Sequence, residues 1–515
     1  MTGFRILIPG AALVFVLAAA LYAPALQGGF AYDSIGQVVY GDYIHRTENL
    51  AEVLTLRVVA LDELDRNRPL HLASLMADAA VWGRNPSGYR LTSVLLHALN
   101  AALVFAIIMS ALVRAGACNR GAFAAIFGAL LFALHPLVVE AVSEPSNRED
   151  LLLLLPVLVG ILVIICARSP LSWFAVNASL ALCAFLAVTA KESGVAAPFI
   201  FVATVLLFDA GRLRKFVPGL VAGFLAVTGF LAASYMFRPL DSAVFLDSPP
   251  PLAADFWTAL GVQSRIWTLQ LFQVFRPANL SAHYQPEVLS GITLPLAVTV
   301  LVAAAGAAAI GAWKNRLVAL GLAVTVLTLL PASNFAAQFQ PVADRYLYAP
   351  LAGGGMIAAA LVAGVWGWAC GRWSRTLLIV AACAVLAAEY SANFRRQQVW
   401  REPLALWSDV VRQFPRAPIA HMGLANAHYR AGRFDAARAA AAECVLASGA
   451  RWDDALALRA ICEWQTGQHD EAVATFRRAV VISPIYLDQA ALGRSMAWSP
   501  AQMEVLARLA QAAGR

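Results

Sequence analysis

Long apolar runs recur along most of this chain, and they limit its possible folds more than any other feature. A membrane interior about 30 Å thick needs roughly 20 apolar residues in a helix, and lipid offers no partner to exposed backbone groups. Only 13% of the residues are charged, against about 25% in a soluble domain. The sequence therefore predicts an all-α polytopic membrane protein with about eleven transmembrane helices. The runs lie near 6–26, 90–113, 121–138, 150–167, 171–189, 195–208, 216–236, 292–313, 317–332, 348–369 and 376–392.

One further segment, 254–276, is less apolar and carries Gln263, Arg265, Gln270 and Gln273. Such side chains are costly in hydrocarbon but suit a helix that lies along the membrane surface. We therefore expect an amphipathic helix in the membrane interface here, not a twelfth span. Counting the segment as a span would also invert the orientation of every later helix.

The charges between the runs indicate the orientation. With the N-terminus in the cytoplasm, every inside connector carries positive charge, as cytoplasmic loops usually do. Almost none of them carries an acid, and Asp209 is the exception. The basic residues are Arg114, Arg120, Arg168, Arg212, Arg214, Lys215, Lys314, Arg316, Arg372 and Arg375. The outside connectors mix acids with His, Asn, Tyr and Pro, so we expect the chemistry on the outer, periplasmic face of an inner membrane. These connectors are 27–89, 139–149, 190–194, 237–291 and 333–347.

After residue 393 the chain becomes polar, Ala-rich and helical in pattern. Two stretches of this part match each other at an offset of 35 residues. The matched pairs are Gly432 with Gly467, Phe434 with His469, Ala437 with Ala472, and Ala441 with Phe476. Paired helices with a Gly turn are typical of tetratricopeptide repeats of about 34 residues, whose stacks expose a concave binding face. We therefore predict a membrane domain over 1–393 and a repeat domain over 394–515, the latter outside.

The remaining composition excludes other classes. The net charge of +7 comes mostly from Arg, but no basic run carries interleaved aromatic residues, so we expect no nucleic-acid partner. The seven cysteines show no metal-type spacing. Cys444 and Cys462 fall on neighbouring repeat helices. An outside location permits a disulfide between them, although two buried free thiols are the favoured interpretation.

The first outer connector begins with GGFAYDSIGQVVY, residues 28–40, which places Asp33 beside Tyr32 directly after the first apolar run. The stretch ALHPLVVEAVSEPSNREDLL follows the third run. In it, apolar neighbours hold His135 and Glu140 at the membrane surface, where ionisable groups are costly unless they are used or paired. For Glu149 and Asp150, a solvated loop with acids at the start of a helix is the favoured interpretation.

Two further outer connectors carry charge at helix ends. Lys191 and Glu192 are either paired helix-end anchors or groups that face a lipid phosphate. Asp344 and Arg345 are either a structural pair or part of a phosphate site, since Arg can grip phosphate with two hydrogen bonds. Tyr346 fits the aromatic belt of the membrane interface. His283, in a fourth outer connector, is either an anchor or part of a lipid entrance.

Six motifs in the same order resemble those of the membrane-bound glycosyltransferases of the GT-C superfamily, and most closely the transmembrane and tetratricopeptide-repeat O-mannosyltransferases and their bacterial relatives. The motifs are FAYDS; RPL with NPSGYRLTSVLLHALNA; LFALHPLVVEAVS with REDLL; AKESGVAAP; RPANLSAHY; and SNF with ADRYLYAPLAG. The resemblance covers nearly the whole chain, including the trailing repeats.

The resemblance implies a polyprenyl-phosphate-linked sugar donor and transfer to a hydroxyl on the outer face. It maps the essential acid of the first outer loop onto Asp33. The other family positions map onto His135, Glu140, Lys191, Glu192, Asp344, Arg345 and Tyr346. The family often has two adjacent acids in the first loop, but Ser34 follows Asp33 here. That departure weakens the case for a divalent metal, whose ligands would be Asp33 and Glu140.

We therefore expect a glycosyltransferase in which Asp33 is the general base. A polyprenyl phosphate leaves as a stable anion, so the reaction needs positive charge near the phosphate but no general acid. The expected donor-binding residues are Arg345, Lys191, Arg148, His135 and Tyr346, supported by Glu140, Glu192, Asp344 and His283. The repeats would hold the acceptor, a protein or a glycan. The alternatives are a transporter or flippase of lipid-linked sugars, and a non-catalytic membrane-anchored repeat scaffold.

Overall fold

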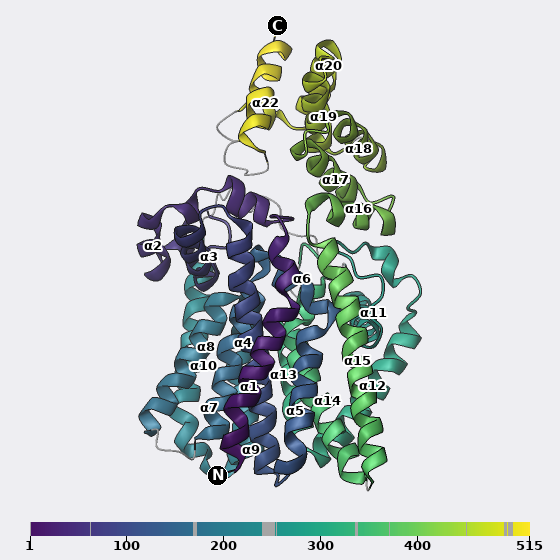
Figure 1. Cartoon of the computed structure of the whole chain (residues 1–515). Coiled ribbons are helices and arrows are strands. Elements are labelled where there is room, and N and C mark those ends of the chain that lie inside the picture. Colours follow the sequence, from purple (N-terminus) through teal and green to yellow (C-terminus); the bar gives the residue numbers. More distant parts are fainter. Residues whose placement is uncertain are drawn as a thin grey trace.

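The computed structural model describes residues 2–61, 63–167, 172–238, 253, 255–334, 338–369, 371–449, 451–488, 492 and 498–514. All regular elements in these residues are helical, which confirms the all-α prediction. Figure 1 shows a long helical bundle with the N-terminus at one end and a smaller helical stack, which ends at the C-terminus, at the other.

The bundle consists of eleven main helices and is a membrane domain. They are α1 (Thr2–Leu21), α4 (Pro86–Arg114), α5 (Cys118–Leu134), α7 (Glu149–Cys166), α8 (Trp173–Ala190), α9 (Ala197–Asp209), α10 (Leu213–Met236), α12 (Leu294–Lys314), α13 (Arg316–Leu329), α14 (Tyr348–Trp368) and α15 (Arg372–Val399). Among the described residues, eight continuous helical segments are long and apolar enough to cross a membrane, or nine with a bent pair. One of the eight, Glu192–Met236, contains both α9 and α10, and α13 is shorter. The count of eleven spans therefore stays a prediction.

The bent pair follows from one proline. Helix α5 ends at Leu134, and Pro136 has no N–H with which to continue the helical hydrogen bonds. The chain turns through 51° between Gly121–Leu134 and Pro136–Ser143, and α6 (Val139–Ser143) follows. This turn keeps Glu140 at the end of the bundle opposite the N-terminus.

Helix α11 (Phe256–Phe275) is not one of the candidate spans among the described helices, and in Figure 1 it is seen nearly along its axis, across the other helices. Its polar side chains bind connectors: Gln263 accepts hydrogen bonds from Asn334, at 3.1 Å from the backbone nitrogen and 2.9 Å from the side chain. Arg265 donates to the backbone carbonyl of Ile292 at 2.6 Å. The predicted amphipathic helix therefore exists, and its polar face packs on protein.

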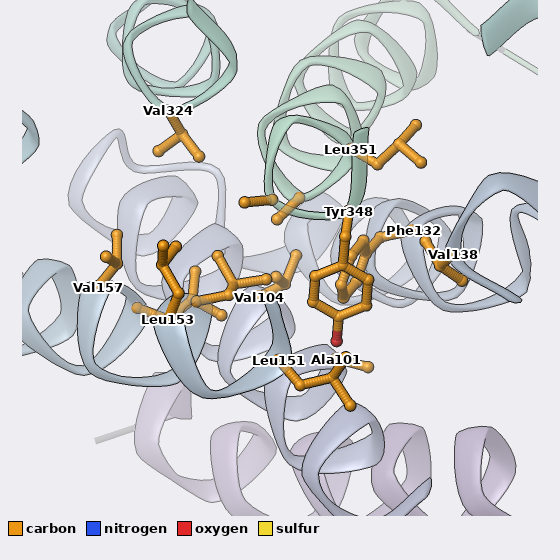
Figure 2. Packing of buried hydrophobic residues seen from close by; sticks show 14 of the residues in the cluster. Ala101, Val104, Phe132, Val138, Leu151, Leu153, Val157, Val324, Tyr348 and Leu351 are labelled. Atoms are coloured by element: carbon orange, nitrogen blue, oxygen red, sulfur yellow. The ribbon is translucent and has the colours of Figure 1, made fainter. Parts of the chain in front are cut away.

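The centre of the bundle is apolar apart from a small polar cluster. Figure 2 shows Tyr348 of α14 packed among side chains of α4, α5 and α7. The Tyr348 hydroxyl lies 2.9 Å from His97 Nδ1, and Asn100 donates to it at 3.2 Å. His97 Nε2 bonds the Ala133 carbonyl at 3.1 Å. Such bonds join helices where lipid offers no alternative partner.

Glycines allow the closest helix contacts. A Cβ on Gly128 of α5 would lie 2.3 Å from the carbonyl oxygen of Gly355 of α14, so any larger residue would separate these two helices. Small residues at such crossings let membrane helices approach through their backbones. This contact fixes the end of α14 that carries the connector with Arg345.

The boundary predicted after residue 393 lies inside α15. This helix therefore leads directly from the bundle into the repeat domain. The described α-helices that follow α15 are α16 (Pro403–Gln413), α17 (Pro418–Arg430), α18 (Phe434–Ala447), α19 (Asp453–Gln465), α20 (His469–Ile482) and α22 (Pro500–Ala513). Gly432 and Gly467 adopt φ of 70° and 81° in equivalent turns, a conformation that favours glycine. Cys444 and Cys462 are buried and free.

Candidate active site

All five predicted outer connectors contribute to one cavity of about 830 Å³. Asp33, Asn147, Lys191, His283 and Arg345 each come from a different connector, and all line it. The first outer connector also contains α2 (Leu50–Leu54) and α3 (Pro69–Trp82), which lie at the end of the bundle next to the repeats (Figure 1). The cavity thus lies where the bundle meets the repeat domain.

A strained turn presents Asp33 to the cavity. Tyr32 has a φ of 53°, which is unfavourable for a bulky residue and persists only where surroundings hold it. The Tyr32 ring stacks on Trp407 of α16, with centroids 5.6 Å apart at 24°, and meets the edge of Trp400 at 6.0 Å. The Gln340 side-chain amide donates to its hydroxyl. The junction to the repeats therefore fixes the residue next to Asp33.

The Asp33 side chain is exposed in the cavity, where surrounding protein replaces part of the water around its carboxylate. This loss of water raises the pKa of Asp33 to about 6; the positive charge of Arg345 opposes the increase, and the negative charges of Asp65 and Glu149 add to it. A carboxyl group with this pKa is ionised near neutral pH and is a stronger base than an ordinary Asp. It can therefore accept a proton from a hydroxyl in the cavity.

Ser34 joins the first connector to the second. Its backbone N–H donates to Glu144 Oε1 at 2.8 Å, its hydroxyl bonds the same oxygen, and Ser146 donates to that oxygen at 2.8 Å. All three residues are buried. The position that often holds a second acid in the resembled family thus serves here to anchor the loop that carries Asp33.

Arg345 is held by Glu140, which lies 205 residues away in sequence. The guanidinium forms an ion pair with Glu140 Oε1, and the Arg345 backbone N–H donates to Oε2 at 3.3 Å. Glu140 is 1% exposed, while Arg345 reaches the cavity. Glu140 therefore orients Arg345. With both oxygens bound in this way, Glu140 does not fit a metal shared with Asp33, and the described residues contain no group of three or more metal ligands.

Lys191 and Arg68 are two further cations of the cavity lining, which also contains the acids Asp65 and Glu149. Lys191 Nζ lies 2.7 Å from Asp150 and 3.5 Å from Glu149. Arg68 lies 3.4 Å from Glu149 and 3.2 Å from Glu192. The interpretation of Glu149 and Asp150 as solvated acids is wrong, because both are buried as partners of these cations. Buried acids fix the cations in place, and both Lys191 and Arg68 line the cavity.

Tyr346 and His283 line the cavity as well. The Tyr346 ring lies 5.7 Å from Lys191 Nζ and 5.2 Å from the Arg345 guanidinium carbon, and its hydroxyl donates to the Gln340 carbonyl at 2.9 Å. The face of an aromatic ring attracts cations, so the Tyr346 ring stabilises both positive groups beside it. Tyr346 therefore keeps the two positive groups on one wall.

Five predicted site residues lie outside the cavity lining: Glu140 and Glu192, which pair with Arg345 and Arg68, and the three described next. Arg148 is fully buried and pairs with Asp78 at 2.5 Å. His135 Nε2 bonds the Val274 carbonyl at 3.0 Å, while its Nδ1 accepts from the Leu137 backbone at 3.3 Å. Both residues join elements around the site and are placed as supports, not as groups that can touch a phosphate.

Asp344 is the third of these residues. It is 1% exposed and pairs with Arg396 of α15 at 3.2 Å, and it accepts a hydrogen bond from Tyr284 at 2.5 Å. Arg396 also contacts Asp409 of α16 at 3.4 Å. Asp344 thus ties the connector of Arg345 to the start of the repeat domain.

Asp65, Arg68 and the wall contributed by the repeats were not among the predicted site residues. Arg68 opens the RPL motif, so a signal for it was present, and Asp65 lies 2.9 Å from it. The repeat wall had no local signal, since it arises from contacts between segments hundreds of residues apart. It consists of Trp407, Ile419, Gly423, Asn426 and Arg430.

The repeat part of the chain resembles known repeat proteins. Residues 393–454 and 440–484 match the family model "Tetratricopeptide repeat", which agrees with the helices observed there. A crystal structure described as ArnT from Cupriavidus metallidurans bound to undecaprenyl phosphate aligns with 96% of this chain and 84% of its own, at 15% identity and a TM-score of 0.39. That score is too low to support a conclusion.

A curated relative carries more information. A protein O-mannosyl-transferase from Caenorhabditis elegans is 23% identical over 429 residues, which cover 78% of this chain and 57% of the relative. The chain thus spans little more than half of that protein's length. The match extends far beyond the repeats, since it is several times longer than they are. The chain is therefore similar to the protein O-mannosyl-transferases, which confirms its resemblance to the transmembrane and tetratricopeptide-repeat members of that group.

Proposed function

We propose that this protein transfers a sugar from a polyprenyl-phosphate-linked donor to a hydroxyl group of a protein or glycan. The observation that carries the proposal is the convergence of all five outer connectors on one cavity, which pairs a carboxylate of raised pKa with a wall of Arg345, Lys191 and Arg68. Among the described residues, none forms a hydrogen bond or ion pair with the Asp33 carboxylate, so it can serve an incoming hydroxyl.

In this mechanism Asp33 removes the acceptor proton as the oxygen attacks the anomeric carbon. The bond from that carbon to the phosphate oxygen breaks, and the polyprenyl phosphate leaves with the bonding electrons. Arg345, Lys191 and Arg68 stabilise the charge that develops on the phosphate. Direct displacement inverts the anomeric configuration. We leave Arg148 and His135 out of the phosphate site because they do not line the cavity.

We also propose that the cavity and the repeats face the periplasm and that the N-terminus faces the cytoplasm. The basic residues predicted for the inside connectors, such as Arg114, Lys314 and Arg316, lie at helix ends on the side of the bundle that holds the N-terminus. That distribution agrees with the positive-inside rule. The repeat wall, with Asn426 and Arg430, is then placed to contact the acceptor.

The test is a cleavage assay on the full chain in liposomes that contain a radiolabelled polyprenyl-phosphate sugar. We expect free polyprenyl phosphate to appear together with labelled product when a hydroxyl acceptor is supplied. A transporter would move the intact lipid-linked sugar across the bilayer, and a scaffold would leave it unchanged. Either of those results would contradict the proposal.

The pKa of Asp33 gives a second prediction. Because that pKa is about 6 and the base must be ionised, kcat/KM should be constant above about pH 7. It should fall nearly tenfold per pH unit below pH 6. The measurement is the initial rate of transfer at subsaturating acceptor, which gives kcat/KM, between pH 4.5 and 8.5, with protein integrity checked at each pH. A rate that rises toward low pH would contradict an Asp base.

A further inference from the structure

A second polar cavity, of about 490 Å³, lies at the opposite end of the bundle from the active site. It is formed where the C-terminal end of α4, the end of α9 and the turn between α12 and α13 meet. Figure 1 places the N-terminus at this end of the bundle. No part of the proposed transfer reaction uses this cavity.

Three cations from three helices line the cavity. Arg114 ends α4, Lys314 ends α12 and Arg316 begins α13. Asp209 lies 3.7 Å from Arg114, and Arg114 also donates to the Phe208 carbonyl at 3.3 Å. Lys314 and Arg316 are both exposed, and no acid is recorded beside either of them within the described residues. The cavity therefore carries excess positive charge that is open to a ligand.

The rest of the lining is mostly apolar. The apolar lining residues are Ala111, Leu112, Ala115, Phe208 and Leu317, and the one other polar residue, Asn315, caps α13 by accepting from the backbone of Leu317. Trp313, next to Lys314, is 92% exposed. An exposed Trp beside a Lys is typical of the membrane–water interface. A free inorganic anion gains nothing from apolar walls, whereas a lipid presents a phosphate and acyl chains together.

We propose that this cavity binds the phosphate headgroup of an anionic phospholipid on the face opposite the active site. Arg316 and Lys314 contact the phosphate, Arg114 contributes charge from the cavity wall, and the acyl chains lie against the apolar residues. Basic pockets between membrane helices bind anionic headgroups in this manner. The occupant would fasten the α12–α13 turn to the ends of α4 and α9.

The experiment compares lipid retention by the full-length protein in native mass spectrometry. The probes are dioleoyl phosphatidylglycerol and dioleoyl phosphatidylcholine at equal concentration, and inorganic phosphate is added as a competitor. We expect wild type to retain phosphatidylglycerol selectively. The preference of the Lys314→Ala/Arg316→Ala variant for phosphatidylglycerol should be at least about tenfold lower than that of wild type. Each cation near an anionic lipid raises the affinity severalfold.

The matched control is Arg212→Ala/Arg214→Ala, which removes two cations from the same end of the bundle without touching the cavity lining. Its selectivity should equal that of wild type. The proposal is overturned if both double variants lose selectivity equally, because the effect would then be general surface charge. It is also overturned if Lys314→Ala/Arg316→Ala retains the lipid, or if millimolar phosphate displaces it completely.

Discussion

Replacing Asp33 by Asn should lower the rate of sugar transfer by about 10²–10⁴-fold, the usual contribution of a general base. The amide has nearly the shape of the carboxylate but cannot accept the acceptor proton. The cations of the cavity wall are unchanged, so donor binding should remain within a few fold of wild type. The measurements are single-turnover transfer in liposomes and donor binding to the same preparation.

Two matched variants separate this role from a general effect of charge. Asp42 lies in the same connector, but it is exposed and pairs with Arg84 at 2.8 Å outside the cavity, so Asp42→Asn should retain full activity. Asp65 lines the cavity but is bound by Arg68 and Gln37, so Asp65→Asn should cost less than Asp33→Asn. Near wild-type turnover by Asp33→Asn would remove the base from the mechanism.

The residual activity of Asp33→Asn carries separate information. If Asp33 is the group that titrates near pH 6, the remaining transfer should lose the decline that wild type shows below that pH. A variant that is slow but keeps the wild-type pH profile would place the titrating group elsewhere in the cavity. This readout distinguishes the base from a residue that only shapes the loop.

The sequence predicted the convergence of the site because a membrane leaves few topologies. Apolar runs fix alternate connectors on one face, so Asp33, Lys191 and Arg345 could be placed together before any contact was known. Their partners could not be predicted in the same way. Glu140 and Arg345 are 205 residues apart, and nothing local to either one indicates the pairing.

Contacts between distant segments also explain why the predicted roles of Arg148, Glu149 and Asp150 differ from the positions of these residues in the structure. Arg148 and Lys191 both stand beside acids in outer connectors, yet Arg148 is buried against Asp78 and Lys191 lines the cavity. Glu149 and Asp150 looked like ordinary acids at a helix start, because a sequence does not show which helix end becomes covered. Burial of a charge depends on packing between distant segments, so residue type and spacing do not determine it.

The repeat domain has a larger role than sequence alone suggested. The segment that follows α15 supplies Trp400 and Trp407 to the Tyr32 ring, and the Arg401 carbonyl accepts a hydrogen bond from Gly29 at 2.9 Å. Deleting residues 394–515 would therefore remove part of the cavity wall as well as the proposed acceptor surface. A point variant is needed to test the two roles separately.

Gly423→Ala should reduce transfer by about 10–100-fold without altering any charged group of the cavity. A Cβ at this position of α17 would lie 2.1–2.4 Å from ring atoms of Trp407, so the indole must move. That movement breaks the stack on Tyr32 and releases the strained turn that presents Asp33. A displacement of about 1 Å at a reacting group can cost about 100-fold in rate. The effect should fall on kcat, with the KM for the donor nearly unchanged.

Gly306→Ala on α12 is the matched control, because a Cβ there meets nothing within 4 Å; it should be fully active. Trp407→Phe keeps a ring for Tyr32 and should recover most of the activity that Trp407→Ala loses, while thermal unfolding monitors the fold of every variant. If Trp407→Ala folds and transfers sugar at the wild-type rate, the repeats do not position the base. If Gly423→Ala instead raises only the KM for the acceptor, Trp407 contacts the acceptor and does not hold the Asp33 turn.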